Sequence, residues 1–324
     1  MLIREKRPAP IIVYVYNRPD HFNKCIDALA ANPLADRSEL YVVSDGAACS
    51  EHEQAVNQVR EIALAAKGFF KVHPMFRETN WGVYASATAA DREVVENHGR
   101  MICLEDDVIT APTFLEFINS GLEFYEQDQR IYSISGYCHT IQFPASYRES
   151  FWLSLVHNSW GFGTWKDRYE SMDVSWNPIS EIRKDWKIYL KMLRYCTWIL
   201  LLLEADKRGV LTAGDARVGG QMLLKGQMSV IPRFSHAKNI GLDGSGINCR
   251  YTPMGDGVDL SNCLSDMSFS NIDIDYQIIR ALNNKISIPG TSLRAVLEGM
   301  DFMHFARKLK KNLIRINNDY LKKR

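Results

Sequence analysis

Three consecutive acidic residues, Glu105, Asp106 and Asp107, follow directly on the apolar run at residues 101–104. Adjacent carboxylates repel one another and resist removal from water, so such a triplet needs solvent, hydrogen bonds or a cation. Mg²⁺ and Mn²⁺ prefer oxygen ligands and often take only one or two protein carboxylates, while phosphate oxygens and waters complete the shell. The triplet therefore indicates a divalent-cation site, and acidic capping of the helix expected near Pro112 is the alternative interpretation.

The backbone at the triplet decides which carboxylates share partners. If the chain stays extended, Glu105 and Asp107 project to one side and Asp106 to the other, because side chains alternate along a strand. We would then expect the three acids to have different partners.

The elements around the triplet alternate short β-branched or aromatic runs with longer helical patterns, which is typical of βαβ units and a mainly parallel sheet. We expect strands at residues 10–16, 39–46, 69–76, 100–107 and 130–137, separated by helices at 17–32, 51–67, 83–97 and 113–127. Ligands gather at the carboxyl ends of such strands. Asn17, Asp45 and the acidic triplet all fall at these ends.

The composition of the chain argues against several classes of protein. The 324 residues are 46% hydrophobic and 24% charged, and the net charge is +1, so nothing favours a nucleic-acid partner. The seven cysteines are odd in number and scattered, which argues against a disulfide framework and a zinc site and predicts a cytoplasmic protein. We expect neither a signal peptide nor a transmembrane anchor.

Beyond about residue 150 the sequence changes character, because six of the seven tryptophans lie between residues 152 and 198. A long helical pattern runs from about Ile179 to Lys207, and a polar, glycine-rich stretch follows at 239–248. We expect an α/β half at 1–137, a second lobe on the same sheet at 138–300, and a terminal helix at 301–324.

Five stretches of the sequence carry a resemblance to a known family: 10–29, 40–46, 101–137, 159–170 and 239–246. Together they are similar to the GT-A class of nucleotide-sugar glycosyltransferases. In particular they resemble the family of N-acetylglucosaminyltransferase I and its bacterial family-2-like relatives. The third stretch is the most specific, because it combines the apolar strand, the acidic triplet, "APTFLEF" and the next strand in one order.

The resemblance implies a GT-A fold, with residues 1–137 as the nucleotide-sugar-binding half and 138–300 as the acceptor-binding and catalytic lobe. It also implies a role for each matching residue. Asp107 would coordinate Mn²⁺ or Mg²⁺, Glu105 would approach the ribose, and Asp106 would approach the hydroxyls of the donor sugar. Asp45 would hydrogen-bond the uracil of a UDP donor, and Arg18 would contact the nucleotide. A metal that bridges the diphosphate also makes physical sense, because it neutralises charge that develops on the leaving group.

An inverting transfer needs a base that takes the proton from the acceptor hydroxyl. The resemblance points to Asp215 in the second half, ahead of a short helix at 216–225 and a strand that ends at Pro232. Asp215 as a simple helix cap is the alternative. Asp167, Asp173 and Asp243 remain other candidates for the base.

Two further features suggest an acceptor site and a lid. Trp160 and Trp165 stand among glycines, so we expect them on a loop where flat rings could meet a sugar, although most tryptophans belong to a core. Asn239 and Asp243 lie in the glycine-rich stretch, which is either a lid that closes over the donor or an ordinary surface loop.

The last segment places apolar residues at three- and four-residue intervals, and 307–324 contains eight basic residues and one acid. This pattern predicts a basic amphipathic helix that lies on an anionic membrane surface at the inner face, or that docks on protein. Membrane contact would suit a saccharide or lipid-linked saccharide acceptor in bacterial surface polysaccharide assembly. A sugar nucleotidyltransferase and a non-catalytic saccharide-binding protein are the rival functions.

Overall fold

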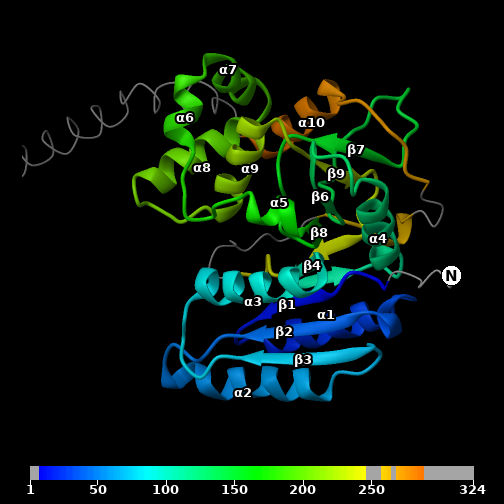
Figure 1. Ribbon diagram of the computed structural model, residues 1–324, viewed down its shortest axis with the longest axis vertical. Coiled ribbons are helices and arrows are strands. Elements are labelled where there is room, and N and C mark those ends of the chain that lie inside the picture. Colours follow the sequence, from blue (N-terminus) through cyan, green and yellow to red (C-terminus); the bar gives the residue numbers. More distant parts are fainter. Residues whose placement is uncertain (1–6, 246–256, 264–267, 288–324) are drawn as a thin grey trace, which may run out of the picture. The chain divides into compact units, whose positions relative to one another are not determined.

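A computed structural model of the chain describes residues 7–245, 257–263 and 268–287 (Figure 1). The chain divides into two compact units, the first built from Met1–Met172 and Gly226–Asp275, and the second from Asp173–Lys225 and Tyr276–Arg324. Strands from segments after residue 137 belong to the sheet of the first unit. The donor-binding half at 1–137 and the acceptor-binding lobe at 138–300 remain predictions. The helix expected at 301–324 lies outside the described residues.

The first unit is built on an eight-stranded sheet with the order β3-β2-β1-β4-β8-β6-β9-β7. The strands are β1 (Ile11–Val15), β2 (Glu39–Ser44), β3 (Lys71–Phe76), β4 (Arg100–Glu105), β6 (Ile131–Ser135), β7 (Phe151–Ser154), β8 (Phe162–Trp165) and β9 (Met228–Pro232). Strands β1 to β4 pair in parallel, whereas β8 runs antiparallel to both β4 and β6, and β7 runs antiparallel to β9. The mainly parallel α/β fold predicted from the sequence is confirmed.

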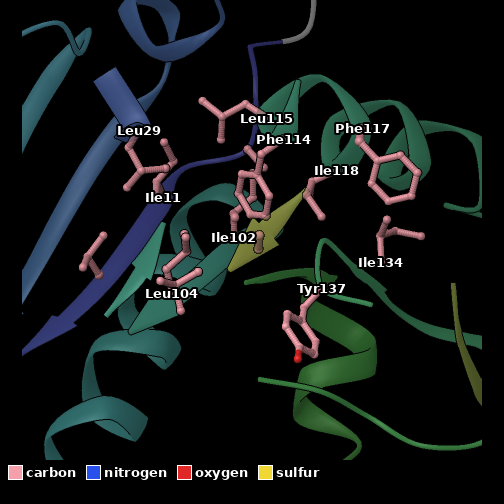
Figure 2. Packing of buried hydrophobic residues seen from close by; sticks show 14 of the residues in the cluster. Ile11, Leu29, Ile102, Leu104, Phe114, Leu115, Phe117, Ile118, Ile134 and Tyr137 are labelled. Atoms are coloured by element: carbon pink, nitrogen blue, oxygen red, sulfur yellow. The ribbon is translucent and has the colours of Figure 1, made fainter. Parts of the chain in front are cut away.

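Helices cover both faces of this sheet, and the period-two pattern of the strands decides which residues meet them. Ile11 of β1 and Ile102 of β4 belong to the larger core cluster (Figure 2). Ile12 and Met101, their chain neighbours, belong to the cluster on the other face. The first cluster includes residues of α1 (Pro19–Ala30), α2 (Ser50–Ala65) and α4 (Phe114–Phe124), and the second includes residues of α3 (Val83–His98).

The carboxyl ends of β1, β2 and β4 lie at the same edge of the sheet because the three strands are parallel. Directly after β4 the chain turns at Asp106 and Asp107 and forms β5 (Val108–Thr110). Strand β5 pairs antiparallel with β10 (Ala237–Asn239) in a separate two-stranded sheet. Short helices complete the unit: η1 (Ala35–Arg37), α5 (Lys166–Glu170) and η2 (Leu260–Asn262).

The second unit is helical in its described part, with α6 (Ile179–Lys184), α7 (Trp186–Tyr195), α8 (Thr197–Lys207), α9 (Gly214–Lys225) and α10 (Tyr276–Ile286). The continuous helical pattern from Ile179 to Lys207 is therefore three helices. Asp185 has an extended backbone and its carboxylate accepts hydrogen bonds from the amides of the first turn of α7, so it starts a new helix. Cys196 also leaves the helical region, with φ −141°, and separates α7 from α8.

Candidate active site

The two aspartates of the triplet lie against a single arginine. Arg18 stands immediately before α1, at the carboxyl end of β1, and its Nη2 donates to Oδ1 of Asp106. Its Nη1 lies 2.8 Å from Oδ2 of Asp107. The backbone turns after Glu105 instead of staying extended, so the alternation of side chains expected for an extended chain does not apply. Asp106 and Asp107 reach the same partner.

Both carboxylates are removed from solvent. Asp106 and Asp107 are each 3% exposed, whereas Arg18 keeps a fifth of its side chain exposed. Burial raises the pKa of Asp106 to about 6, although Arg18 acts in the opposite direction. Burial lowers the pKa of Arg18, but the two carboxylates outweigh this and raise it above its usual value. The guanidinium is thus the positive charge that compensates the acid pair.

The segment after β10 covers Asp107. The carboxamide of Asn239 donates to Oδ1 of Asp107 over 3.3 Å, and the amide of Ile240 donates to its backbone carbonyl over 2.8 Å. Gly241 lies so close to Oδ2 of Asp107 that a Cβ at this position would collide with it. Residues 239–241 therefore lie directly against Asp107. The role of this segment as a lid remains a prediction.

The same segment also contacts the first helix. Oδ2 of Asp243 lies 3.1 Å from Nε2 of His21 in α1, while its Oδ1 accepts hydrogen bonds from the amide and hydroxyl of Ser245. Asp243 has about half of its side chain exposed. These contacts hold Asp243 beside α1, so a role in positioning the segment suits it better than one as the base.

Asp45, at the carboxyl end of β2, is a backbone anchor in this structure. Its Oδ1 accepts from the amides of Gly46 and Trp81, both at 2.9 Å, and its Oδ2 accepts from the amide of Gly82 at 2.8 Å. Gly82 is the cap residue that precedes α3. With two acceptor positions on each oxygen, Oδ2 keeps one for another donor, such as the N–H of a nucleobase.

The two tryptophans expected near the acceptor lie differently. Trp165 ends β8, is 3% exposed, and donates from its indole N–H to the carbonyl of Leu122 over 3.1 Å. It belongs to the core, and its expected place on a loop that meets the acceptor is wrong. Trp160 precedes β8, is half-buried, and packs edge-on against Tyr137 with ring centroids 4.7 Å apart.

Asp215 lies in the second unit, in the first turn of α9, and is exposed. The helix begins at Gly214, one residue before Asp215 and two before the start expected from the sequence. Nearby, the carboxylate of Asp206 accepts from both Nε and Nη2 of Arg217 in α9, and from the carboxamide of Asn177 over 2.6 Å. These bonds fix the start of α9 within the second unit.

The alternative acids are engaged locally. Asp173 accepts from the amide and hydroxyl of Ser175, and Asp167 pairs with Arg168 over 2.9 Å and accepts from Gln129.

The side chains around Asp106 and Asp107 can be compared with the ligands that a divalent cation requires. No group of three metal-ligating side chains occurs among the described residues. A Mg²⁺ or Mn²⁺ site needs only one or two protein carboxylates when phosphate oxygens supply further ligands, and Asp107 offers oxygens of this kind. Oδ2 of Asp107 faces Arg18, so the residues fit such an ion once the guanidinium leaves that oxygen.

Some residues of this site were missed from the sequence. His21 follows Arg18 by three residues, so both lie on one side of the first helical turn, and this spacing was the signal. Arg60 of α2 donates to the backbone carbonyl of Asp45 over 3.3 Å and to that of Arg77 over 2.6 Å. No sequence pattern marked Arg60, because these partners are backbone atoms.

Comparison with known proteins finds no matching family model and no matching curated protein. Among solved structures, the chain is similar to a mannosyltransferase from Pyrobaculum calidifontis, determined with GDP-Man and Mn²⁺. The TM-score is 0.40 at 12% identity, covering 71% of this chain and 55% of that one. It is also similar to residues 1–349 of TarS from S. aureus, with a TM-score of 0.40 at 9% identity, covering 71% and 59%.

The chain thus spans less than two thirds of the length of either structure. At TM-scores of 0.40 these likenesses carry no weight in assigning a function. Membership of the N-acetylglucosaminyltransferase I family remains a prediction from the sequence.

Within the described residues, no helix has the length and apolar character needed to cross a membrane.

Proposed function

We propose that the chain is a glycosyltransferase that moves a sugar from a nucleoside diphosphate to a saccharide hydroxyl. The observation that carries this proposal is the fork of Arg18 on Asp106 and Asp107 at the carboxyl edge of a parallel sheet. Substrates of α/β proteins bind at this edge, and a diphosphate is the kind of anion that a guanidinium can bind through paired hydrogen bonds. The acid pair beside it suits the sugar and a cation.

Each donor-side residue has a role in this proposal. Arg18 releases the carboxylates and turns its paired N–H groups to the diphosphate. Asp45 uses its remaining acceptor position for the N–H of the base, with UDP as the expected nucleotide. Glu105 binds the ribose and Asp106 binds sugar hydroxyls.

Asp107 would hold Mn²⁺ or Mg²⁺ together with the phosphates. When bound, this ion neutralises the negative charge that the nucleoside diphosphate acquires as it leaves. The segment from Asn239 to Asp243 would close over the donor and exclude water from it.

On the acceptor side, Asp215 is the proposed base of an inverting transfer. It is exposed at the start of α9, and the bonds of Asp206 to Arg217 hold this helix turn in place. A carboxylate on a fixed helix turn can accept the proton from the acceptor hydroxyl while the hydroxyl oxygen attacks the anomeric carbon. A lipid-linked saccharide in polysaccharide assembly at the cytoplasmic side of a membrane is the acceptor class that we propose.

The test is a donor screen with the full chain, in which nucleoside diphosphate release is measured with Mn²⁺ and with EDTA. We expect metal-dependent release from one nucleotide sugar. With that donor and a saccharide acceptor, Asp215→Asn should lower kcat about a hundredfold or more, while Asp173→Asn is the matched control. If no nucleotide sugar releases its nucleoside diphosphate, the proposed glycosyltransferase activity is contradicted. Full turnover by Asp215→Asn would contradict only the assignment of Asp215 as the base.

A further inference from the structure

One face of α7 combines exposed apolar and basic side chains. Trp186 is 65% exposed and Leu190 is 53% exposed. The two residues are four apart, so they lie on the same face of the helix. Met192 is buried, and it projects from the opposite side, where α7 packs within its own unit.

Positive charge adjoins this apolar pair. The helix contains Lys187, Lys191 and Arg194 and no acidic residue. At 100° per residue, the basic residues follow the apolar pair around the helix axis with no other residue between them. The order around the axis is Trp186, Leu190, Arg194, Lys187 and Lys191. The ammonium of Lys187 lies 5.9 Å from the centre of the Trp186 ring, so charge and ring share one surface.

Both ends of α7 are held by contacts, so the exposure of this face is not caused by fraying of the helix. The carboxylate of Asp185 accepts from the amides of Lys187 and Ile188 at 3.0 and 3.1 Å and thus caps the helix start. At the other end, Tyr195 packs against Tyr276 of α10, with ring centroids 4.8 Å apart.

We propose that this face of α7 binds the surface of an anionic lipid bilayer. Trp side chains favour the boundary between lipid headgroups and acyl chains, Leu adds apolar area, and Lys and Arg are attracted to anionic headgroups. Like charge disfavours two occupants from the chain itself. A second copy of α7 repels the first, and the segment 307–324 has eight basic residues against one acid.

The test is co-sedimentation of the full chain with vesicles of phosphatidylglycerol and phosphatidylcholine, and with vesicles of phosphatidylcholine alone. We expect binding to the anionic vesicles that weakens with salt. The double variant Trp186→Ser, Leu190→Ser should bind about tenfold or more weakly. The control Trp176→Ser, Val210→Ser removes two exposed apolar side chains elsewhere in the same unit and should bind as the wild type does.

A second pair of variants separates the local charge of α7 from the general charge of the chain. Neutralising Lys187, Lys191 and Arg194 to Ser should weaken binding to the anionic vesicles about tenfold or more. Removing three exposed lysines of the first unit, Lys24, Lys67 and Lys71, should leave binding within about twofold, because these residues lie outside α7.

Since every variant keeps the segment 307–324, any contribution of that segment is the same throughout. Unchanged circular dichroism and melting temperature establish that each variant is folded. Wild-type-like binding by the variants of α7 would overturn the proposal. Failure of the wild type to bind either type of vesicle would also overturn the proposal. In that case, a change of oligomeric state in the variants would indicate that this face binds protein. None of these results bears on the donor site, which lies in the first unit.

Discussion

Nη1 of Arg18 lies 2.8 Å from Oδ2 of Asp107, one of the two oxygens of this carboxylate that a divalent cation could bind. The guanidinium and a metal ion are therefore alternative partners of one carboxylate. The guanidinium compensates the charge of two buried acids. In the proposed function, a nucleotide donor draws it away because the phosphates offer the same kind of acceptor. Under that proposal the exchange would connect donor binding to metal binding, and it leads to predictions about stability as well as activity.

Replacing Arg18 by Gln should make the fold depend on added metal. Two buried carboxylates lose their counter-charge, so the free energy of unfolding should fall by about 2–3 kcal/mol. Mn²⁺ should restore more stability to this variant than to the wild type, because it no longer competes with the guanidinium. Melting temperatures with Mn²⁺ and with EDTA test this.

Arg7→Gln is the control for that experiment, since it removes an exposed partner of Glu39 at 3.4 Å and should change stability by less than about 1 kcal/mol. An Arg18→Gln protein as stable as the wild type, with no greater response to Mn²⁺, would show that the two charges do not compete.

Replacing Gly241 by Ala should disturb the cover over Asp107. The added methyl collides with Oδ2 of Asp107, so the segment must move, at a cost of about 1–3 kcal/mol. We expect a lower melting temperature and weaker nucleotide binding. Gly219→Ala is the matched control, because its Cβ would meet Ile199 at an ordinary 3.7 Å. Equal behaviour of the two variants would mean that Gly241 does not need to lie so close.

Replacing Asp45 by Asn should loosen the start of α3. One carboxylate oxygen becomes an N–H₂ group that faces a backbone amide of Gly46, Trp81 or Gly82, so at least one buried hydrogen bond is lost. The free energy of unfolding should fall by about 2 kcal/mol in urea titrations. Nucleotide affinity should fall with it. Stability equal to that of the wild type would rule out the anchor role.

Asp91 predicts a pH dependence of stability that is separate from the donor site. Burial raises the pKa of Asp91 to about 7, against the lowering by hydrogen bonds from Tyr14 and Tyr169. Because the folded chain holds this proton more tightly than the unfolded chain, the group favours the folded state at low pH. That contribution is lost as the pH rises towards 7.

Relative to Asp91→Asn, the wild type should therefore lose about 2–3 kcal/mol of stability between about pH 5 and pH 8. Tyr169→Phe removes one of the hydrogen bonds that lower the pKa, so it should move the transition to higher pH. Parallel pH profiles for the wild type and Asp91→Asn, measured by urea unfolding, would show that Asp91 titrates normally.

The strands and their order along the chain could be predicted because buried strands appear in the sequence as short apolar stretches. Residues 101–104 are apolar without a break, as expected of a strand covered on both faces. The turn at Asp106 and Asp107 could not be predicted, because it depends on β5 pairing with β10. Local sequence around the triplet contains no signal for a partner so far along the chain.

The misplacement of Trp165 has a similar cause. Gly161 and Gly163 suggested a loop, but Gly163 lies within β8, where a Cβ would collide with Ile118 and Leu122 of α4. Here the glycine marks close packing of a helix on a strand. Arg18 was expected to contact a nucleotide, and its contact with the acids was missed because the sequence does not reveal distances between strand ends.

The most direct test of the donor site is calorimetric binding of UDP, with GDP, dTDP and CMP as comparators, to the wild type and to Asp107→Asn in Mn²⁺ and in EDTA. We predict that the wild type binds one nucleoside diphosphate only with Mn²⁺, and that Asp107→Asn loses this binding while it remains folded. Binding of no nucleotide by the wild type, or equal binding by Asp107→Asn, would contradict the central claim that Asp107 belongs to a metal-dependent donor site.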